Sequence, residues 1–438
     1  MVMFFHFGMN TFTDSEWGSG KEDPRLFNPS ALDTKQWVAV AKAAGVSLVI
    51  LTAKHHDGFC LWPSLYTRHS VRYSPWRRGR GDVIAELATA VGEEGIDLGL
   101  YLSPWDRHDP RYGNTLLYNE YYMAQLHELL TRYGEISEVW FDGAKGQNAP
   151  KMRYMFKRWF STAHQLQPAI NIFSDAGPDV RWVGNENGSC GPTCWSLFNA
   201  SHAQIGIGAN PKLLNSGDPH GVNWVPPECD VSIRPGWFWH KHQHPKTPTE
   251  LLDLYYNSAG RNCVLLLNAP PNSSGLLAPE DIHALLSFKQ MRDSIFAFNL
   301  ASNSTSQIHA SSHRGRPFHA LNVIDGRSDT FWAAAQGRIY STITLTFKCP
   351  IAFNVIELKE PVELGQRVAK YLVRARENNK WRLFSTGTTI GFRKLDRNCT
   401  VKASHVQLVI HKARAEPLLS TFSLYHDLVS KPSSFCSS

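Results

Sequence analysis

The 438-residue sequence predicts an α/β fold: a (β/α)8-like barrel of the TIM type over residues 1–298, followed by an all-β sandwich domain over residues 299–438. Three observations predict it. Short apolar runs alternate with helical patterns, as in the βα units of a parallel sheet. Polar residues follow at least five of these runs, and a barrel brings such strand ends to one mouth. Beyond residue 299, short segments of alternating polarity replace the helical patterns, which is typical of a β-sandwich.

The apolar runs are short and continuous, which is typical of parallel strands buried on both faces. We expect strands over residues 2–7, 46–51, 96–102, 136–141, 169–175 and 263–268. Apolar residues at helical spacing predict helices over residues 34–44, 82–94, 118–133, 151–167 and 251–259. Asp82 is the expected N-cap of its helix. Glycines are expected to stop four of the helices, at Gly45, Gly95, Gly134 and Gly260.

A doubly wound sheet is the alternative arrangement of the same units. That fold usually carries a glycine-rich phosphate loop after its first strand. Here the first strand runs into His6-Phe-Gly8, which lacks the G-x-G-x-x-G pattern. The sequence therefore favours the barrel.

The C-terminal third begins with residues 299–315, which are rich in Ser, Asn and His and predict a linker or first loop. Period-2 patterns then predict strands over residues 342–347, 353–358, 371–376, 381–384 and 405–410. We expect this unit to pack against the barrel.

Composition argues against nucleic-acid-binding and membrane-spanning proteins. The net charge is +7 without any run of five like charges, so basic patches such as residues 77–80 are expected to be solvated loops, and no nucleic-acid partner is expected. No apolar stretch reaches about 18 residues, so no membrane span is expected. Aromatic residues make up 12% of the chain; they suit stacking on sugars and an ordinary large core equally well.

The eight cysteines do not form the pattern of a disulfide framework. Cys190 and Cys194 form a C-x3-C pair without a second pair at zinc-ligand spacing, so no metal is expected, and a local or longer-range disulfide stays open. Five N-x-S/T sequons permit a secreted glycoprotein. Because the chain starts directly on a core strand, we expect an upstream segment, the place for a secretion signal.

Asp142 follows a buried strand, where a carboxylate is costly unless something uses it or pairs with it. We interpret it as the nucleophile of a sugar-cleaving enzyme; the alternative is a carboxylate that caps the following turn. Such chemistry needs a second carboxylate across the sugar. Glu186 and Glu228 are the candidates, both expected in loops near the barrel mouth, and the residues alone do not separate them.

His55 and His56 are adjacent, directly after a predicted strand. Neighbours on a strand point to opposite faces, so both can bind one metal only beyond its end. Three interpretations stay open: contacts to substrate hydroxyls, histidines satisfied within the core, and a metal hydrolase that uses both with Asp142.

Eight stretches together resemble glycoside hydrolase family 29, the α-L-fucosidases, and in particular the plant secreted type that prefers α-1,3/4-linked fucose. They run in the family's order: His6-Phe-Gly8, Asp14-Ser-Glu16-Trp17-Gly18, Lys54-His55-His56-Asp57-Gly58-Phe59, Ser103-Pro-Trp-Asp106, Trp140-Phe-Asp142-Gly-Ala144, Arg181-Trp-Val-Gly-Asn-Glu186, Ser232-Ile-Arg-Pro-Gly-Trp237 and Arg261-Asn-Cys-Val-Leu-Leu-Leu-Asn268.

The resemblance implies a retaining mechanism with Asp142 as nucleophile and Glu186 as acid/base, leaving Glu228 as the rival. It also implies a set of fucose contacts, namely His6, Glu16, Trp17, His55, His56, Tyr101, Trp140 and Trp237. No metal or other cofactor is expected. The expected substrate is a fucosylated oligosaccharide of glycans, glycoproteins or the cell wall, cleaved outside the cell in the apoplast. A fucose-binding lectin-like protein without catalysis is the alternative.

Overall fold

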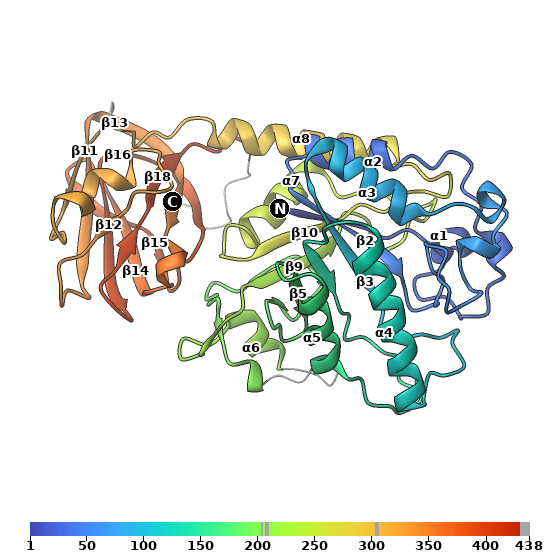
Figure 1. Ribbon diagram of the computed structural model, residues 1–438. Helices are drawn as coiled ribbons and strands as arrows, with labels where there is room; N and C mark the ends of the chain where they lie inside the picture. Colours follow the sequence, from blue (N-terminus) through green and yellow to red (C-terminus); the bar gives the residue numbers. More distant parts are fainter. Residues whose placement is uncertain (203–204, 206–209, 303–305, 430–438) are drawn as a thin grey trace.

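The computed structural model describes residues 1–202, 205, 210–302 and 306–429. Eight parallel strands close into a barrel in the order β1-β10-β9-β6-β5-β4-β3-β2 (Figure 1). The strands are β1 Val2–Phe5, β2 Leu48–Lys54, β3 Asp97–Leu102, β4 Glu138–Trp140, β5 Asn171–Ser174, β6 Val180–Trp182, β9 Pro227–Ser232 and β10 Val264–Asn268. This is a TIM-type barrel, so the predicted fold class of the first unit is confirmed.

Helices surround the barrel and cover the outer faces of its strands (Figure 1). The longer ones are α2 Thr34–Ala43, α3 Val83–Glu94, α4 Thr115–Arg132, α5 Phe156–Leu166, α7 Pro248–Asn257 and α8 Pro279–Phe296. Two short helices, α1 Met9–Thr13 and α6 Pro211–Ser216, lie in loops beyond strand ends. The sequence analysis missed α8, the helix that leads to the second unit.

Alternate side chains of the strands point into the barrel, as the two-residue period of a strand requires. The buried cluster inside the barrel is aromatic and aliphatic: Val2, Phe4, Ile50, Tyr101, Trp140, Phe173 and Leu266. The intervening residues face outward and form the larger core with the helices. The interior is therefore packed rather than hollow, and open space begins only above this layer, at the carboxyl ends of the strands.

Two barrel strands, β6 and β9, were absent from the prediction. Strand β6 has three residues, too few for a periodic pattern. In β9, Glu228 and Asp230 lie two residues apart, and both are buried. Strand propensity disfavours such carboxylates, but inside this barrel indole groups donate hydrogen bonds to them. The expectation that Glu228 lies in a loop was therefore wrong.

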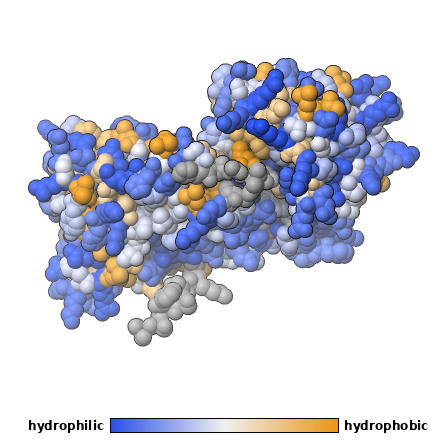
Figure 2. All heavy atoms as spheres, turned by 90° about the horizontal axis from the view of Figure 1, so that it is seen from below, coloured by the Kyte–Doolittle hydropathy of each residue, from blue (hydrophilic) through white to orange (hydrophobic). Residues whose placement is uncertain are grey.

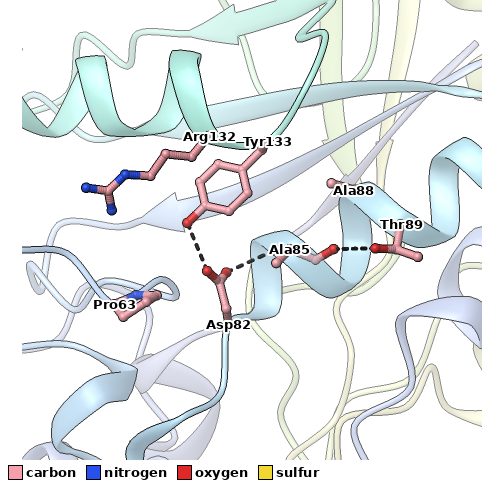
Figure 3. Close-up of a pocket in the computed structure, with 7 residues that line it drawn as sticks. All are labelled: Pro63, Asp82, Ala85, Ala88, Thr89, Arg132 and Tyr133. Atoms are coloured by element: carbon pink, nitrogen blue, oxygen red, sulfur yellow. Dashed lines mark hydrogen bonds between the residues drawn. The ribbon is translucent and has the colours of Figure 1, made fainter.

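The helix ends test the capping predictions. The Asp82 carboxylate accepts a hydrogen bond from the Ala85 amide at 2.9 Å and caps α3, as predicted. The Tyr133 hydroxyl donates to its other oxygen at 3.0 Å. Figure 3 shows both bonds beside a shallow surface pocket between α3 and the end of α4, and they account for the carboxylate without any ligand.

Three of the four predicted glycine stops are confirmed. Gly45, Gly95 and Gly134 adopt φ values of 80°, 66° and 80°, in the left-handed region that favours glycine. Gly260 is the exception, because α7 ends at Asn257 and Gly260 does not have a positive φ. A Cβ at this position would lie 2.5 Å from the Tyr256 carbonyl oxygen, so close packing explains this glycine.

The second unit is all-β, as predicted, and its strands pair antiparallel. Its main sheet contains β11 Ser306–Ala310, β13 Ser341–Lys359, β14 Val368–Glu377, β15 Lys380–Gly387, β16 Lys394–Ala413 and β18 Thr421–Tyr425. The short strands β12 Trp332–Ala333 and β17 Leu418–Leu419 form a second, two-stranded sheet. The sandwich is thus confirmed in part. Strand β11 falls within the segment expected to be a linker, which also includes residues 303–305, outside the described residues.

The two units lie side by side, with α8 running along the barrel toward the sheet domain (Figure 1). The placement of the boundary between residues 298 and 299 stays a prediction. Cys229 and Cys263 form a disulfide that joins the neighbouring strands β9 and β10. Cys190 and Cys194 are buried free thiols beside it. Within the described ranges, no helix is long and apolar enough to cross a membrane.

Candidate active site

A cavity of about 660 Å³ opens at the carboxyl ends of the barrel strands. Ten of the eleven residues singled out from the sequence line it: His6, Glu16, Trp17, His55, His56, Tyr101, Trp140, Asp142, Glu186 and Trp237. They lie on, or in the loops after, six different strands, so only closure of the barrel brings them together. Glu228 is not part of this lining.

Asp142 lies two residues beyond β4, and a hydroxyl and a backbone amide hold its carboxylate in place. Tyr101 donates its hydroxyl to Oδ2 at 2.9 Å, and the Ala144 amide donates to Oδ1 at 2.7 Å. The His56 Nε2 atom lies 3.7 Å from Oδ2. One oxygen thus caps the following turn, as the alternative interpretation supposed, while the carboxylate also lines the cavity.

His6 is held by an amide whose orientation is fixed. The Asn268 side-chain NH2 donates to the Trp237 carbonyl at 2.7 Å and to Ser232 Oγ at 2.9 Å, so its Oδ1 is an acceptor. His6 Nδ1 lies 2.9 Å from that oxygen and must carry the proton. Burial lowers the pKa of His6 to about 3. The ring is neutral, and its Nε2 offers a lone pair to a hydroxyl in the cavity.

The hydrogen-bond partners of His56 and His55 fix the proton on different ring nitrogens, so the two rings are opposite tautomers. Ser103 donates its hydroxyl to the Trp105 carbonyl at 2.6 Å, so His56 Nδ1, at 2.7 Å, must donate to Ser103 Oγ. Its Nε2 is therefore an acceptor. The Asn10 NH2 donates to the Glu16 carbonyl at 2.9 Å and to His55 Nδ1 at 3.3 Å, which leaves Nε2–H of His55 as a donor.

Both rings are neutral near pH 7. Burial lowers the pKa of His56 to about 4 and that of His55 well below its usual range. With His6, the cavity therefore presents two imidazole acceptors and one imidazole donor. A sugar hydroxyl both donates and accepts, so this mixture suits a polyhydroxylated ligand.

Glu186 lies after β6 at the rim of the cavity, where Trp237 Nε1 is 3.4 Å from its Oε2. Partial withdrawal from water raises the pKa of Glu186, and the charges of Asp142 and Glu16 raise it further. A carboxyl group with a raised pKa on the same cavity as a second carboxyl group is the pairing that an acid and a nucleophile require.

Glu228 is sealed inside the barrel and only 1% exposed. Trp140 donates its indole N–H to Oε1 at 3.0 Å. Burial raises the pKa of Glu228 to about 7. Its pKa would suit an acid, but Trp140 stands between this carboxyl group and the cavity lining.

Aromatic side chains form the floor and one wall of the cavity. Trp140 is stacked on Phe173 with ring centroids 3.9 Å apart. Trp17 is 48% exposed and meets the rings of His56 and Trp105 edge-on. An exposed indole face above a polar cavity suits the apolar face of a sugar.

The sequence analysis missed Asp230, which lines the cavity and accepts a hydrogen bond from Trp182 Nε1 at 2.9 Å. Burial raises its pKa well above the usual range. The signal was the two-residue spacing from Glu228, which places both carboxyl groups on the inner face of one strand. In the part of the chain that is described, no three His, Cys, Asp or Glu side chains form a cluster arranged to hold a metal ion.

Comparison with known proteins gives one consistent family. The model of the α-L-fucosidase family matches residues 5–291, and that of the F5/8 type C domain matches residues 307–420. Alpha-L-fucosidase 1 of Arabidopsis thaliana is 54% identical over 433 residues, covering 98% of this chain and 85% of the relative.

Two solved structures are similar to this chain over nearly its whole length. SpGH29 is 41% identical with a TM-score of 0.94, over 97% of this chain and 95% of that one. A GH29 fucosidase of Ruminococcus gnavus, solved in complex with fucose, is 34% identical with a TM-score of 0.90, over 97% and 92% of the two chains.

Proposed function

The chain belongs to the α-L-fucosidase family of glycoside hydrolases, and from this premise we propose that it is a retaining exo-enzyme in which Asp142 is the nucleophile and Glu186 the acid/base. The observation that carries the proposal is the difference between the two carboxyl groups on one cavity. Asp142 accepts hydrogen bonds on both oxygens, whereas Glu186 has a raised pKa.

The first step forms a fucosyl-enzyme. Asp142 Oδ attacks the anomeric carbon while Glu186 transfers its proton to the leaving glycosidic oxygen, so that the C–O bond breaks and the aglycone departs as an alcohol. The oxygen that caps the turn at Ala144 holds the carboxylate in place. Ionised Glu186 then takes a proton from water, which attacks the same carbon and releases fucose and Asp142. Two inversions give net retention.

Substrate recognition is divided between the imidazoles and the indoles. His6, His55 and His56 supply two acceptors and one donor for ring hydroxyls, and Trp17 or Trp140 covers the apolar side near the fucose methyl group. Glu16 and Tyr101 complete the set of polar contacts. This assignment supports the enzyme over a lectin-like protein, because both carboxylates that hydrolysis needs line the cavity.

The aglycone belongs on the side of Pro211 and Leu214, which line the cavity from the long excursion between β6 and β9. We propose a preference for α-1,3- and α-1,4-linked fucose of glycans, glycoproteins or cell-wall oligosaccharides. We also propose that the protein is a glycoprotein secreted to the apoplast, with the sequon at Asn187, next to Glu186, left without a glycan. Hydrolysis rates on α-1,2-, 1,3-, 1,4- and 1,6-linked fucosides test the linkage preference.

The catalytic assignment has a direct test with an aryl fucoside. We expect Asp142→Ala to lose fucose release, and Glu186→Ala to recover turnover with azide. Azide replaces water in the second step, so the product of Glu186→Ala is the α-fucosyl azide, whereas any rescue of Asp142→Ala gives the inverted β-azide. Both anomers are resolved by NMR. Retained activity in Asp142→Ala, or rescue in Glu228→Ala but not in Glu186→Ala, would contradict the assignment.

A further inference from the structure

His240 lies between two carboxylates at the edge of the cavity. Its Nδ1 is 2.6 Å from Asp14 Oδ1, and its Nε2 is 2.6 Å from Glu16 Oε1. Ionised carboxylates only accept hydrogen bonds, so each ring nitrogen must carry a proton. An imidazolium cation between two carboxylates satisfies both contacts, in contrast to the three neutral histidines inside the cavity. Hydrogen bonds to Asp14 and Glu16 also raise the pKa of His240.

Glu16 connects this histidine to the reacting groups. Its Oε1 faces His240, and its Oε2 accepts the Trp237 amide at 2.9 Å. The indole of the same Trp237 lies 3.4 Å from Glu186. Because both oxygens accept hydrogen bonds, the Glu16 carboxylate has one fixed orientation. Its remaining lone pairs therefore keep a fixed direction toward the cavity.

The backbone at Gly236 packs closely against both Glu16 and His240. A Cβ on Gly236 would lie 2.3 Å from Glu16 Oε1 and 3.0 Å from His240 Cδ2. The loop is anchored independently of the imidazole: buried Arg234 donates to Asp281 at 2.9 Å and to Glu280 at 2.7 Å, both at the start of α8. The ion pairs of Arg234 therefore hold the loop without the imidazole of His240, which remains to hydrogen-bond Glu16.

We propose that His240 is a positioning residue of the fucosidase reaction, whose imidazolium, shared between Asp14 and Glu16, orients Glu16 toward the fucose hydroxyls and offsets its negative charge next to Glu186. The inference rests on the proposed roles of Glu16 in sugar binding and Glu186 as acid. It assigns a function to His240 and Asp14, which do not line the cavity.

The proposal has a consequence for the pH profile. In the described part of the chain, the charged groups acting on His240 are Asp14 and Glu16, and those raising the pKa of Glu186 are Asp142 and Glu16. Asp230 is also within electrostatic range of Glu186. Without the cation, the Glu16 charge acts on Glu186 unopposed and raises its pKa further. Because the acid must be protonated, the alkaline limb of kcat/KM moves to higher pH.

The test compares His240→Gln, His240→Ala and Asp14→Asn with His242→Gln, which changes an exposed histidine two residues further along the same loop. Glutamine keeps a donor but not the charge. We expect His240→Gln to weaken inhibition by free L-fucose about tenfold, the loss typical of a misdirected charge-assisted hydrogen bond. We also expect its alkaline limb to rise by about half a pH unit, with a smaller effect in Asp14→Asn.

His242→Gln should match the parent protein in both measurements. The proposal is overturned if His240→Gln also matches it, or if the His240 variants lose activity only in proportion to their folded fraction, with the alkaline limb unmoved. Failure here is distinguishable from failure of the proposed function. If only the His240 proposal fails, Asp142→Ala is inactive and His240→Gln behaves like the control. If the proposed function fails, Asp142→Ala itself retains turnover.

Discussion

The carboxyl groups of this barrel differ in what surrounds them. Asp142 accepts hydrogen bonds from a hydroxyl and a backbone amide. Glu16 accepts them from an imidazolium and a backbone amide. Glu228 accepts one from an indole deep in the interior. Hydrogen bonds and cations favour the ionised form, whereas burial favours the neutral one. In the mechanism proposed above, the neighbours of a carboxyl group therefore decide whether it serves as nucleophile, sugar ligand or structural acid.

Glu228 provides a prediction about a carboxyl group outside the cavity. Glu228→Gln keeps an oxygen for the Trp140 indole, so we expect activity on an aryl fucoside to stay within a few-fold of the parent. Glu228→Ala leaves the indole N–H buried without a partner and opens a void, which should lower the free energy of unfolding by about 2–4 kcal/mol in urea denaturation. A loss of activity beyond a hundredfold in Glu228→Gln, restored by azide, would contradict this.

The buried carboxyl group of Asp57 should make the free energy of unfolding depend on pH. It is 1% exposed, and burial raises its pKa to about 7 from 3.8, while the Phe59 amide opposes the shift. The unfolded chain loses this proton at lower pH than the folded chain, so the contribution of Asp57 to stability falls as pH rises from about 4 to about 7. The upper limit of this loss is roughly 4 kcal/mol.

Urea denaturation at pH 4 and pH 7.5 tests Asp57. Asp57→Asn keeps the acceptor for Phe59, so the stability of the parent relative to this variant should be higher at pH 4 than at pH 7.5. Asp97→Asn, at an exposed position, is the control and should follow the parent. Parallel behaviour of parent and Asp57→Asn across the range would refute the assignment.

At the scale of elements, glycine has different causes at different helix ends. Gly95 follows α3 with a left-handed φ of 66° and open space around the missing side chain. Gly260 has no such φ, but it lies against the Tyr256 carbonyl and the Leu395 side chain. The first cause is local and can be predicted from the sequence. The second depends on close packing, part of it against a residue of the other unit.

Two substitutions separate these causes. Gly92 lies inside α3 with nothing within 4 Å of its missing Cβ, so Gly92→Ala should raise the free energy of unfolding by about 0.5–1 kcal/mol through helix propensity. Gly260→Ala forces a Cβ to 2.5 Å from a carbonyl oxygen and should cost about 1–3 kcal/mol. Thermal unfolding of both variants gives the sign, and equal shifts would show that packing at Gly260 is looser than described.

At the scale of the whole molecule, the sheet domain has its own core but also contributes side chains to the core of the barrel unit. Val355, Leu395 and Tyr425 of the sheet domain pack in the same buried cluster as the barrel helices. Polar contacts join them too: Leu395 donates its amide to Gly260 at 2.8 Å, and Tyr256 its hydroxyl to Asp427 at 3.0 Å. On the face seen in Figure 2, apolar residues are scattered among hydrophilic ones, so that face shows no extensive apolar patch.

These contacts between the units predict cooperative unfolding. We expect scanning calorimetry to give one transition for the full chain, because separating the units would expose the apolar side chains of the sheet domain that pack in the barrel cluster. Leu395→Ala, at a position 6% exposed, should lower the stability of that single transition by about 2–5 kcal/mol. Two separate heat-absorption peaks in the parent protein would contradict the prediction.

The barrel class and most of its strands and helices could be predicted from the sequence, because these depend on local periodicity and on caps such as Asp82. The sequence also singled out Asp142 and the strand-end histidines, since polar residues stand out directly after buried runs. The sequence analysis missed β6 and β9, because their polar residues interrupt the apolar pattern of a buried strand. Without the family resemblance, it could not decide whether Glu186 or Glu228 is the second carboxylate of the site. Only the tertiary structure placed Glu186 on the cavity and Glu228 beneath it, and joined His240 to Glu16 across 224 residues. Those relations depend on barrel closure, which brings distant segments within hydrogen-bond range, and no local pattern encodes that distance.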